Sequence, residues 1–308
     1  MTIQWFPGHM NKAKKAIIDR VKNIDLVIEV LDARLPCSSI SPLLAQNTRN
    51  IPKLKVLNKS DLADENRTNI WIEYLKQQQQ TDAISIVAHD KNNGKKIMNL
   101  CRKLLPHRGG IEKPLRIMIC GVPNVGKSTL INTMLGKKSA KTGNEPGITK
   151  AEQRLILADD FWLYDTPGML WQKIIVAESG YNLAIAGSVG RNALDEEEVA
   201  LYLISYLKNH YLNLLQARYK LNELNSETPD EEWLEMIACQ RGAISSGHRV
   251  NFQKAAEIIL QDFRSGNIGK ISLEEPIEWG NWYKTAKQIE EEKQKLKAER
   301  KQQNNSKQ

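Results

Sequence analysis

A glycine-containing stretch at residues 121–129, Gly-Val-Pro-Asn-Val-Gly-Lys-Ser-Thr, follows directly after an apolar segment. Gly121, Gly126, Lys127 and Ser128 fit the fixed positions of the pattern G-x-x-x-x-G-K-[ST]. Glycines let backbone N–H groups curl around phosphate oxygens, and the helix that follows directs the positive end of its dipole at them. The stretch therefore predicts a loop that binds nucleotide phosphates rather than an ordinary glycine turn.

Two side chains of this phosphate loop have a defined chemistry. Lys127 would reach the β- and γ-phosphates, and the hydroxyl of Ser128 would ligate Mg²⁺. We also predict Lys127 as a catalytic residue. The predicted phosphate-binding residues are Asn124, Val125, Gly126, Lys127, Ser128 and Thr129.

A second motif, Asp-Thr-Pro-Gly, ends an apolar strand at residues 165–168. The carboxylate of Asp165 suits a group that holds a Mg²⁺-bound water, and the N–H of Gly168 can meet the γ-phosphate. Between the two motifs, Thr149 can supply a second hydroxyl to the metal, as a switch threonine does in GTPases, and is predicted to act in catalysis. Ser128, Thr149 and Asp165 form the predicted metal set.

The segment Leu-Asn-Lys-Ser-Asp, residues 57–61, predicts which base is bound. A carboxylate at Asp61 can accept both N1–H and N2–H of guanine, whereas adenine has an acceptor at N1 and no 2-amino group. Asn58 would assist from the side, the stem of Lys59 would pack over the ring, and Ser60 completes the loop. Alone, the segment could equally be a polar turn. Beside the phosphate loop it indicates guanine.

A companion segment, Ser-Ile-Val-Ala-His-Asp, follows at residues 85–90. We expect a backbone N–H near Ala88 to bond the O6 atom of guanine. Most GTPases have Ser-Ala at this point, and this chain has Val87 and Ala88, so the contact lacks the usual serine hydroxyl. Both residues are predicted to line the base site.

The order of these motifs is unusual, because the base-binding segment precedes the phosphate loop. In this order the chain resembles the circularly permuted GTPases of the ribosome biogenesis GTPase A (YlqF-like) family. The resemblance rests on Trp-Phe-Pro-Gly-His-Met at residues 5–10, Leu-Asp-Ala-Arg-Leu-Pro at 31–36, the motifs above, and the stretch 255–274. It implies a cytoplasmic enzyme that hydrolyses GTP to GDP and acts late in assembly of the large ribosomal subunit. Members bind the particle through both domains, and the particle stimulates hydrolysis.

The group that orients the attacking water is not supplied at the usual place. Ordinary GTPases have Gln after Asp-x-x-Gly, whereas this chain has Met169, which cannot hydrogen-bond a water usefully. The permutation should bring residues 5–10 beside the γ-phosphate, so His9 is the predicted catalytic residue. The alternative is that these residues only cap the following helix.

A monovalent cation is a further predicted cofactor. Related GTPases with Asn at the place of Asn124 can use K⁺ to neutralise charge on the β/γ oxygens. Asn also suits a tight loop on conformational grounds alone.

Alternating strand and helix patterns between Ile24 and Tyr164 are the scaffold that must position these motifs. They predict an α/β, doubly wound, mostly parallel sheet, here a circularly permuted P-loop GTPase domain, followed by a smaller all-α domain. The predicted domains are residues 1–174, with a lead-in at 1–23, and a helical RNA- and ribosome-binding domain at 175–283. The charged tail at 284–308 is predicted to be a frayed helix that runs into disorder. Strands are expected at 25–31, 53–57, 83–87, 116–120, 152–157 and 161–164, and helices at 10–21, 70–77, 95–105, 127–135 and from Asp195, Thr228 and Asn251.

The charge and the cysteine content of the chain indicate its binding partners and its cellular compartment. The net charge of +8 suggests a polyanion, and basic residues gather at 11–22 and 284–308. Such runs are often only solvated faces, but the resemblance favours contact with rRNA phosphates. The four scattered cysteines indicate reduced thiols in the cytosol, and no apolar run is long enough for a membrane span. We expect a monomer.

Three functions fit the sequence: an RNA-activated GTPase in ribosome assembly, a guanine-nucleotide sensor with negligible hydrolysis, and a GTPase with another RNA client. The chain after Gly168 leads straight into the helical domain, so nucleotide state should move that domain, unless the connection is a passive linker. Asp32 and Arg34, in a loop that guanine does not need, are either structural or an RNA contact.

Overall fold

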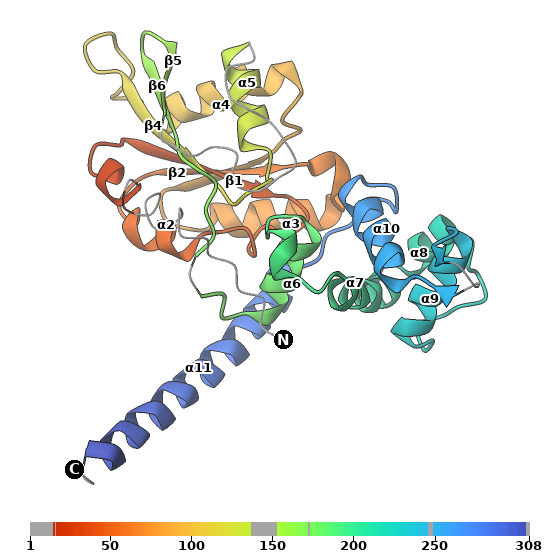
Figure 1. Cartoon of the computed structure of the whole chain (residues 1–308). Helices are drawn as coiled ribbons and strands as arrows, with labels where there is room; N and C mark the ends of the chain where they lie inside the picture. Colours follow the sequence, from red (N-terminus) through yellow and green to blue (C-terminus); the bar gives the residue numbers. More distant parts are fainter. Residues whose placement is uncertain (1–14, 16, 137–152, 172, 246–248, 306–308) are drawn as a thin grey trace.

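A sheet of six strands forms the centre of the N-terminal part in the computed structural model, which describes the chain apart from residues 1–14, 16, 137–152, 172, 246–248 and 306–308 (Figure 1). The strands are β1 (Leu26–Asp32), β2 (Lys53–Asn58), β3 (Thr81–Ser85), β4 (Leu115–Cys120), β5 (Gln153–Ala158) and β6 (Phe161–Asp165). They lie in the order β3-β2-β1-β4-β6-β5, and only β5 runs antiparallel to its neighbour. The predicted mostly parallel sheet is confirmed, with each strand within two residues of its expected bounds.

Helices cover both faces of this sheet, which explains why its central strands β1, β2 and β4 are almost entirely buried. All residues of β1 and β2 are buried. Helix α3 (Glu65–Lys76) lies on one face, and α4 (Lys91–Leu104) and α5 (Lys127–Leu135) lie on the other, while the short α2 (Pro42–Asn47) follows β1 (Figure 1). The carboxyl ends of β1, β2, β4 and β6 therefore meet at one edge, where ligands bind in folds of this class.

Side-chain caps explain where the helices begin. Helix α3 begins earlier than predicted because Asp64 accepts a hydrogen bond from the N–H of Arg67 (3.0 Å), and Asp90 caps α4 in the same way through Asn92 (3.0 Å). Helix α5 has the predicted bounds. Of the predicted helix at 10–21, the described residues 15 and 17–21 are helical.

The second part of the chain is helical, as predicted. It contains α6 (Ala177–Ile185), α7 (Glu196–His210), α8 (Leu212–Tyr219), α9 (Asp230–Gln240) and α10 (Phe252–Arg264), with a small hairpin of β7 (Ile244–Ser245) and β8 (Arg249–Val250). Asp195 caps α7 by accepting the N–H groups of Glu197 and Glu198, and Asn251 caps α10 through Lys254. The sequence did not predict α6 and α8 as separate helices.

The charged tail, which the sequence predicts as a frayed helix running into disorder, belongs to helix α11 (Pro276–Asn305). It continues as one helix through the charged segment and projects away from both domains (Figure 1). Straight-chain charged residues have good helix propensity, so a highly charged sequence can still be helical. No helix among the described residues is both long and apolar enough to cross a membrane.

The segment between α10 and α11 fastens the two domains together through Glu274. This side chain is fully buried and accepts hydrogen bonds from the backbone N–H groups of Cys37 (2.5 Å) and Ser38 (3.0 Å) in the loop after β1. The hydroxyl of Ser38 donates to its other oxygen, and Asn182 of α6 lies 3.3 Å away. Burial raises the pKa of Glu274 to about 7, although these hydrogen bonds act in the opposite direction.

We predict that Glu274 makes the stability of the protein depend on pH. Its folded-state pKa lies above the ordinary value of 4.5, so its contribution is fully present below pH 4.5 and is lost as the pH rises through about 7. Relative to Glu274→Gln, which mimics the protonated acid, the wild type should lose about 3 kcal/mol of unfolding free energy between pH 4.5 and pH 8. Urea unfolding of both proteins across this range measures the difference. The exposed Glu232→Gln is the control, and parallel pH profiles for wild type and Glu274→Gln would contradict the prediction.

Candidate nucleotide-binding site

The phosphate loop connects β4 to α5 and depends on its two glycines. A Cβ atom on Gly121 would lie 2.5 Å from the carbonyl oxygen of Val30 in β1, and one on Gly126 would lie 2.2 Å from Nδ2 of Asn58. Gly126 also has a φ of +92°, which disfavours other residues. Ser128 and Thr129 lie half-buried in the first turn of α5. The glycines thus allow the loop to approach two neighbouring strands closely.

Lys127 and Asp165 form a buried ion pair that joins the phosphate loop to the end of β6. Burial raises the pKa of Asp165, although the Lys127 ammonium opposes the shift. The loop that continues from Asp165 returns to the phosphate loop, because a Cβ on Gly168 would lie 3.2 Å from Cα of Pro123. The structure therefore brings together the predicted phosphate-binding lysine, the predicted metal carboxylate and the predicted γ-phosphate N–H.

The amide of Asn58 joins three loops at the edge of the sheet. Its Nδ2 donates to the carbonyl oxygen of Val125 (2.7 Å), and its Oδ1 accepts the backbone N–H of Ala88 (2.8 Å). The side chain is buried, in contrast to that of Asp61, which is exposed at the same edge. Asn58 thus holds the base-binding loop, the phosphate loop and the companion loop at fixed separations.

Backbone carbonyl groups of the companion loop bind side chains on both of its sides. The hydroxyl of Ser60 donates to the carbonyl oxygen of Ile86 (3.0 Å), and the carbonyl oxygen of Val87 accepts from Asn93 (2.9 Å). Because the N–H of Ala88 already donates to Asn58, its proposed bond to guanine O6 would have to be shared with that amide. This role of Ala88 stays a prediction.

Lys59 contacts Asp32, which in turn binds Arg34, and the sequence left the role of these two residues open. Its ammonium lies 2.8 Å from Oδ2 of Asp32, and Asp32 also binds the guanidinium of Arg34. Asp32 and Arg34 are each 1% exposed. These two side chains are therefore too deeply buried to contact RNA.

The second domain contacts the phosphate loop directly, at the turn that ends α6. Nδ2 of Asn124 donates to the carbonyl oxygen of Gly187 (2.6 Å), and the hydroxyl of Ser188 donates to the carbonyl oxygen of Pro123 (2.8 Å). Gly187 and Ser188 belong to no recognisable motif, so sequence patterns gave no signal for them. A shift of α6 would act directly on the phosphate loop.

Two predicted catalytic residues, His9 and Thr149, lie outside the described residues. Met169 is 3% exposed and its neighbour Leu170 is fully buried, so both pack into the core. At the described end of the N-terminal helix, the guanidinium of Arg20 lies 4.4 Å from the ring centre of Tyr164 in β6. That helix therefore packs against the strand that ends in Asp165, and the position of His9 stays a prediction.

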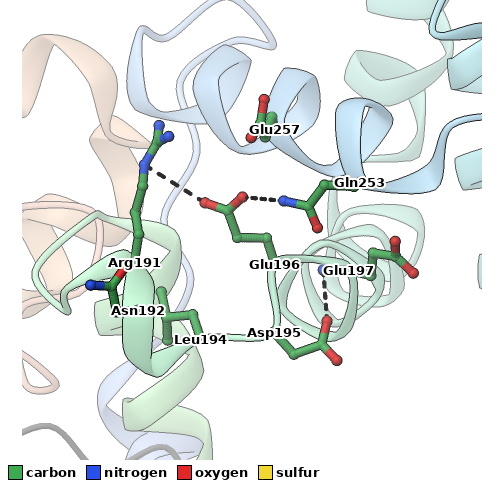
Figure 2. Close-up of a pocket in the computed structure, with 8 residues that line it drawn as sticks. All are labelled: Arg191, Asn192, Leu194, Asp195, Glu196, Glu197, Gln253 and Glu257. Atoms are coloured by element: carbon green, nitrogen blue, oxygen red, sulfur yellow. Dashed lines mark hydrogen bonds and ion pairs between the residues drawn. The ribbon is translucent and has the colours of Figure 1, made fainter.

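A cavity of about 630 Å³ in the second domain lies apart from these loops (Figure 2). Its walls are rich in carboxylates, and Glu196 points between Arg191 and Gln253, with Gln253 donating to it at 2.6 Å. Negatively charged walls repel phosphate groups. The cavity is therefore not a second nucleotide site.

The chain is similar to known GTPases over nearly its whole length. A family model described as "RsgA GTPase" matches residues 7–174, and one described as "50S ribosome-binding GTPase" matches residues 116–236. "Ribosome biogenesis GTPase A" of Bacillus cereus is 39% identical over 298 residues, which cover 94% of this chain and 100% of the relative. The chain belongs to the ribosome biogenesis GTPase A family. The Priestia megaterium member is 40% identical over 286 residues, which cover 90% of this chain and 98% of that one.

A solved structure has the same arrangement. "GNP-bound YlqF from T. maritima" matches with a TM-score of 0.61 and 25% identity, covering 86% of this chain and 98% of that chain. The predictions of a P-loop GTPase fold, of guanine nucleotide binding, of GTP hydrolysis and of a role in ribosome biogenesis are thereby confirmed. The assignment of single residues to the site rests on the geometry described above.

We predict that Asp61→Asn weakens GTP binding strongly, because an amide cannot accept two guanine protons and sets one donor against another. Loss of paired polar contacts of this kind costs about 2–5 kcal/mol. Xanthosine triphosphate, which carries an oxygen in place of the 2-amino group, should recover part of the affinity. Titration calorimetry with both nucleotides checks this. Asp159→Asn, exposed in the turn between β5 and β6, is the control, and equal GTP affinity in Asp61→Asn and wild type would overturn the assignment.

Proposed function

We propose that this GTPase acts in late assembly of the large ribosomal subunit and that the immature particle stimulates its hydrolysis. Relatives named for ribosome biogenesis and the match to a "50S ribosome-binding GTPase" model support this partner. The observation that carries the proposal is the contact of the phosphate loop with Gly187 and Ser188. A particle bound to the second domain can act on the phosphates through this contact, which favours direct coupling over a passive linker.

Mg²⁺ is the metal we propose for the site, held by Ser128, Thr149 and Asp165. Hydroxyl and carboxylate oxygens are the donors that Mg²⁺ prefers, and Ser128 and Asp165 follow strands that lie side by side in the sheet. When bound, the ion would neutralise charge on the phosphate oxygens. Lys127, which pairs with Asp165, would then turn to the phosphates.

K⁺ is the second cation we propose, near Asn124. The hydrogen bond from Nδ2 of Asn124 to Gly187 fixes which end of the amide faces the second domain. This supports a defined orientation of the amide oxygen, the atom that would contact a monovalent cation. Because Gly187 follows α6, the affinity for the cation would depend on the position of α6.

The rRNA of the particle is the proposed polyanionic partner, and the protein is proposed to be cytoplasmic and monomeric. The net charge of +8 supports an anionic partner. Helix α11 projects from the domains as a long charged rod, so the basic tail is available for phosphate contacts (Figure 1). The carboxylate-lined cavity beside α7 repels phosphate groups and so favours other faces for the rRNA contact.

GTP turnover with and without purified large-subunit particles tests this function. We expect at least about tenfold stimulation, which corresponds to about 1.4 kcal/mol of transition-state stabilisation. Binding to the particle should be tighter with a non-hydrolysable GTP analogue than with GDP and should weaken as salt rises.

The proposed K⁺ site is tested by comparing GTP turnover in K⁺ and in Na⁺ at equal ionic strength. Identical rates would contradict it.

The alternatives give different results in the same assay. A nucleotide sensor would bind the particle without turnover, and a GTPase with another RNA client would hydrolyse GTP at a rate that the particle leaves unchanged. Either outcome would contradict the proposed function.

We predict that His9→Ala preserves GTP affinity but lowers particle-stimulated turnover by about 10²-fold, the usual scale for a positioned acid–base group. The physical reason is that the side chains of Met169 and Leu170 are packed into the core, so neither can orient the attacking water and the role falls to His9. Single-turnover kinetics on saturating particles measure the rate, with the exposed His107→Ala as control. Unchanged stimulated turnover with intact particle binding would assign the water to the ribosome instead.

A further inference from the structure

A buried cluster of one acid and two bases lies directly behind the base-binding loop. The carboxylate of Asp32 receives the guanidinium of Arg34 in a bidentate pair, with Nε 2.9 Å from Oδ1 and Nη2 2.9 Å from Oδ2. The ammonium of Lys59 donates to the same Oδ2 at 2.8 Å, and the backbone N–H of Arg34 donates to Oδ1 at 3.1 Å. Each carboxylate oxygen of Asp32 thus accepts two hydrogen bonds, which fix the orientation of its side chain.

Lys59 is the member of the cluster that belongs to the base-binding loop. Its backbone has a φ of 62° and a ψ of 35°, a left-handed conformation that non-glycine residues adopt at a cost. The bond to Asp32 compensates for this cost, because it directs the ammonium inward and so fixes the line of the alkyl stem. A stem with a fixed direction is what packing over a flat base requires.

Arg34 connects this arrangement to the second domain. Its Nη1 donates to the carbonyl oxygen of Phe263 at the end of α10 (3.1 Å), and its guanidinium lies 4.7 Å from the centre of the Phe263 ring. The backbone carbonyl of Arg34 accepts the N–H of Leu273 (2.7 Å). The excess positive charge of the cluster is therefore satisfied only when the end of α10 is seated against it.

The same end of α10 also reaches the phosphate side of the site. Arg264 donates to the carbonyl oxygens of Ile185 (2.8 Å) and Ala184 (2.9 Å), which end α6 next to the contact between Gly187 and Asn124. Adjacent residues of α10 thus contact the supports of the base-binding loop and of the phosphate loop. A shift of α10 would therefore move the supports of both the base-binding loop and the phosphate loop.

We propose that Asp32 and Arg34 are positioning residues for guanine recognition: Asp32 holds Lys59 over the base, and Arg34 makes that hold depend on the seating of α10. The inference rests on the assignment of Asn58–Asp61 as the base-binding loop. It names the route by which a partner on the second domain changes guanine nucleotide affinity.

A double-mutant cycle with Lys59 tests the proposal, with the affinity for GDP as the readout. Arg34→Lys keeps the charge but loses the bidentate pair and the bond to Phe263, and should weaken GDP binding by about tenfold, the effect of one charge-assisted hydrogen bond. Lys59→Met should weaken it to a similar extent. Because Arg34 acts through Lys59, adding Arg34→Lys to Lys59→Met should cause less than about twofold further loss. If Arg34 only stabilised the fold, the fold-losses in GDP affinity of the two single variants would multiply in the double variant.

Matched variants complete the experiment. Arg102→Lys disrupts another bidentate pair of the same domain, with Asp160 (2.8 Å for both bonds), and should leave GDP affinity within about twofold of wild type. Phe263→Leu removes the ring beneath Arg34 but keeps the backbone carbonyl that accepts from Nη1, so it should weaken GDP binding less than Arg34→Lys does, and this smaller loss should also disappear in the Lys59→Met background. This variant decides the question if Arg34→Lys alters the circular dichroism spectrum.

Multiplied losses in both cycles, or unchanged GDP affinity in Arg34→Lys and Phe263→Leu, would overturn the proposal. Unchanged affinity in Lys59→Met would also overturn it, because that variant loses only the ammonium that Asp32 holds. Failure of the base-binding loop assignment would appear separately, as unchanged GTP affinity in Asp61→Asn. None of these measurements uses ribosomal particles, so failure of the proposed ribosomal function is seen separately.

Discussion

The two hydrogen bonds of the Asn58 amide are the constraint on which the nucleotide site depends. One bond reaches the phosphate loop at Val125 and the other reaches the companion loop at Ala88. The three loops follow different strands, β2, β4 and β3, so no local interaction along the chain fixes their separation. A buried amide with both ends satisfied does so, and Gly126 must lack a side chain because this amide occupies the space.

The permuted order of the motifs changes the chain connectivity but leaves the sheet edge intact. β1 lies between β2 and β4, so the base-binding loop and the phosphate loop flank a common strand although about sixty residues separate them in sequence. The permutation also sends the chain from Gly168 straight into the second domain. As a result, α6 ends beside the phosphate loop, and the segment after α10 returns to the loop after β1.

Buried polar groups, in addition to apolar surface, hold the two domains together. Glu274 binds the loop after β1, Arg34 binds the end of α10, and Arg67 donates to the carbonyl oxygen of Ser272 (2.9 Å). Such contacts are directional and fail if the domains shift by a small distance, because an unpaired buried polar group is costly. The interface therefore favours one relative position of the domains.

Local chemistry was readable from the sequence. The phosphate loop, the Asp-Thr-Pro-Gly motif and the base-binding loop each need particular residue types at short spacings, and each lies at the end of a strand that contains apolar residues. The helix starts predicted at Asp195 and Asn251 are confirmed, because a cap acts on backbone groups two or three residues away, whereas the helix predicted from Thr228 begins at Asp230. The charged composition of the tail predicts solvent exposure, and it does not by itself prevent a helix such as α11.

Only the tertiary structure decided which distant groups meet. Asp32 and Arg34 could have been an RNA contact, and their burial against Lys59 and Phe263 excludes it. Gly187 and Ser188 carry no pattern at all, because a carbonyl oxygen and a hydroxyl become important only where the fold places them beside the phosphate loop. The sequence by itself determined the chemistry of each loop, which is local. The coupling between loops and domains is non-local, and packing alone established it.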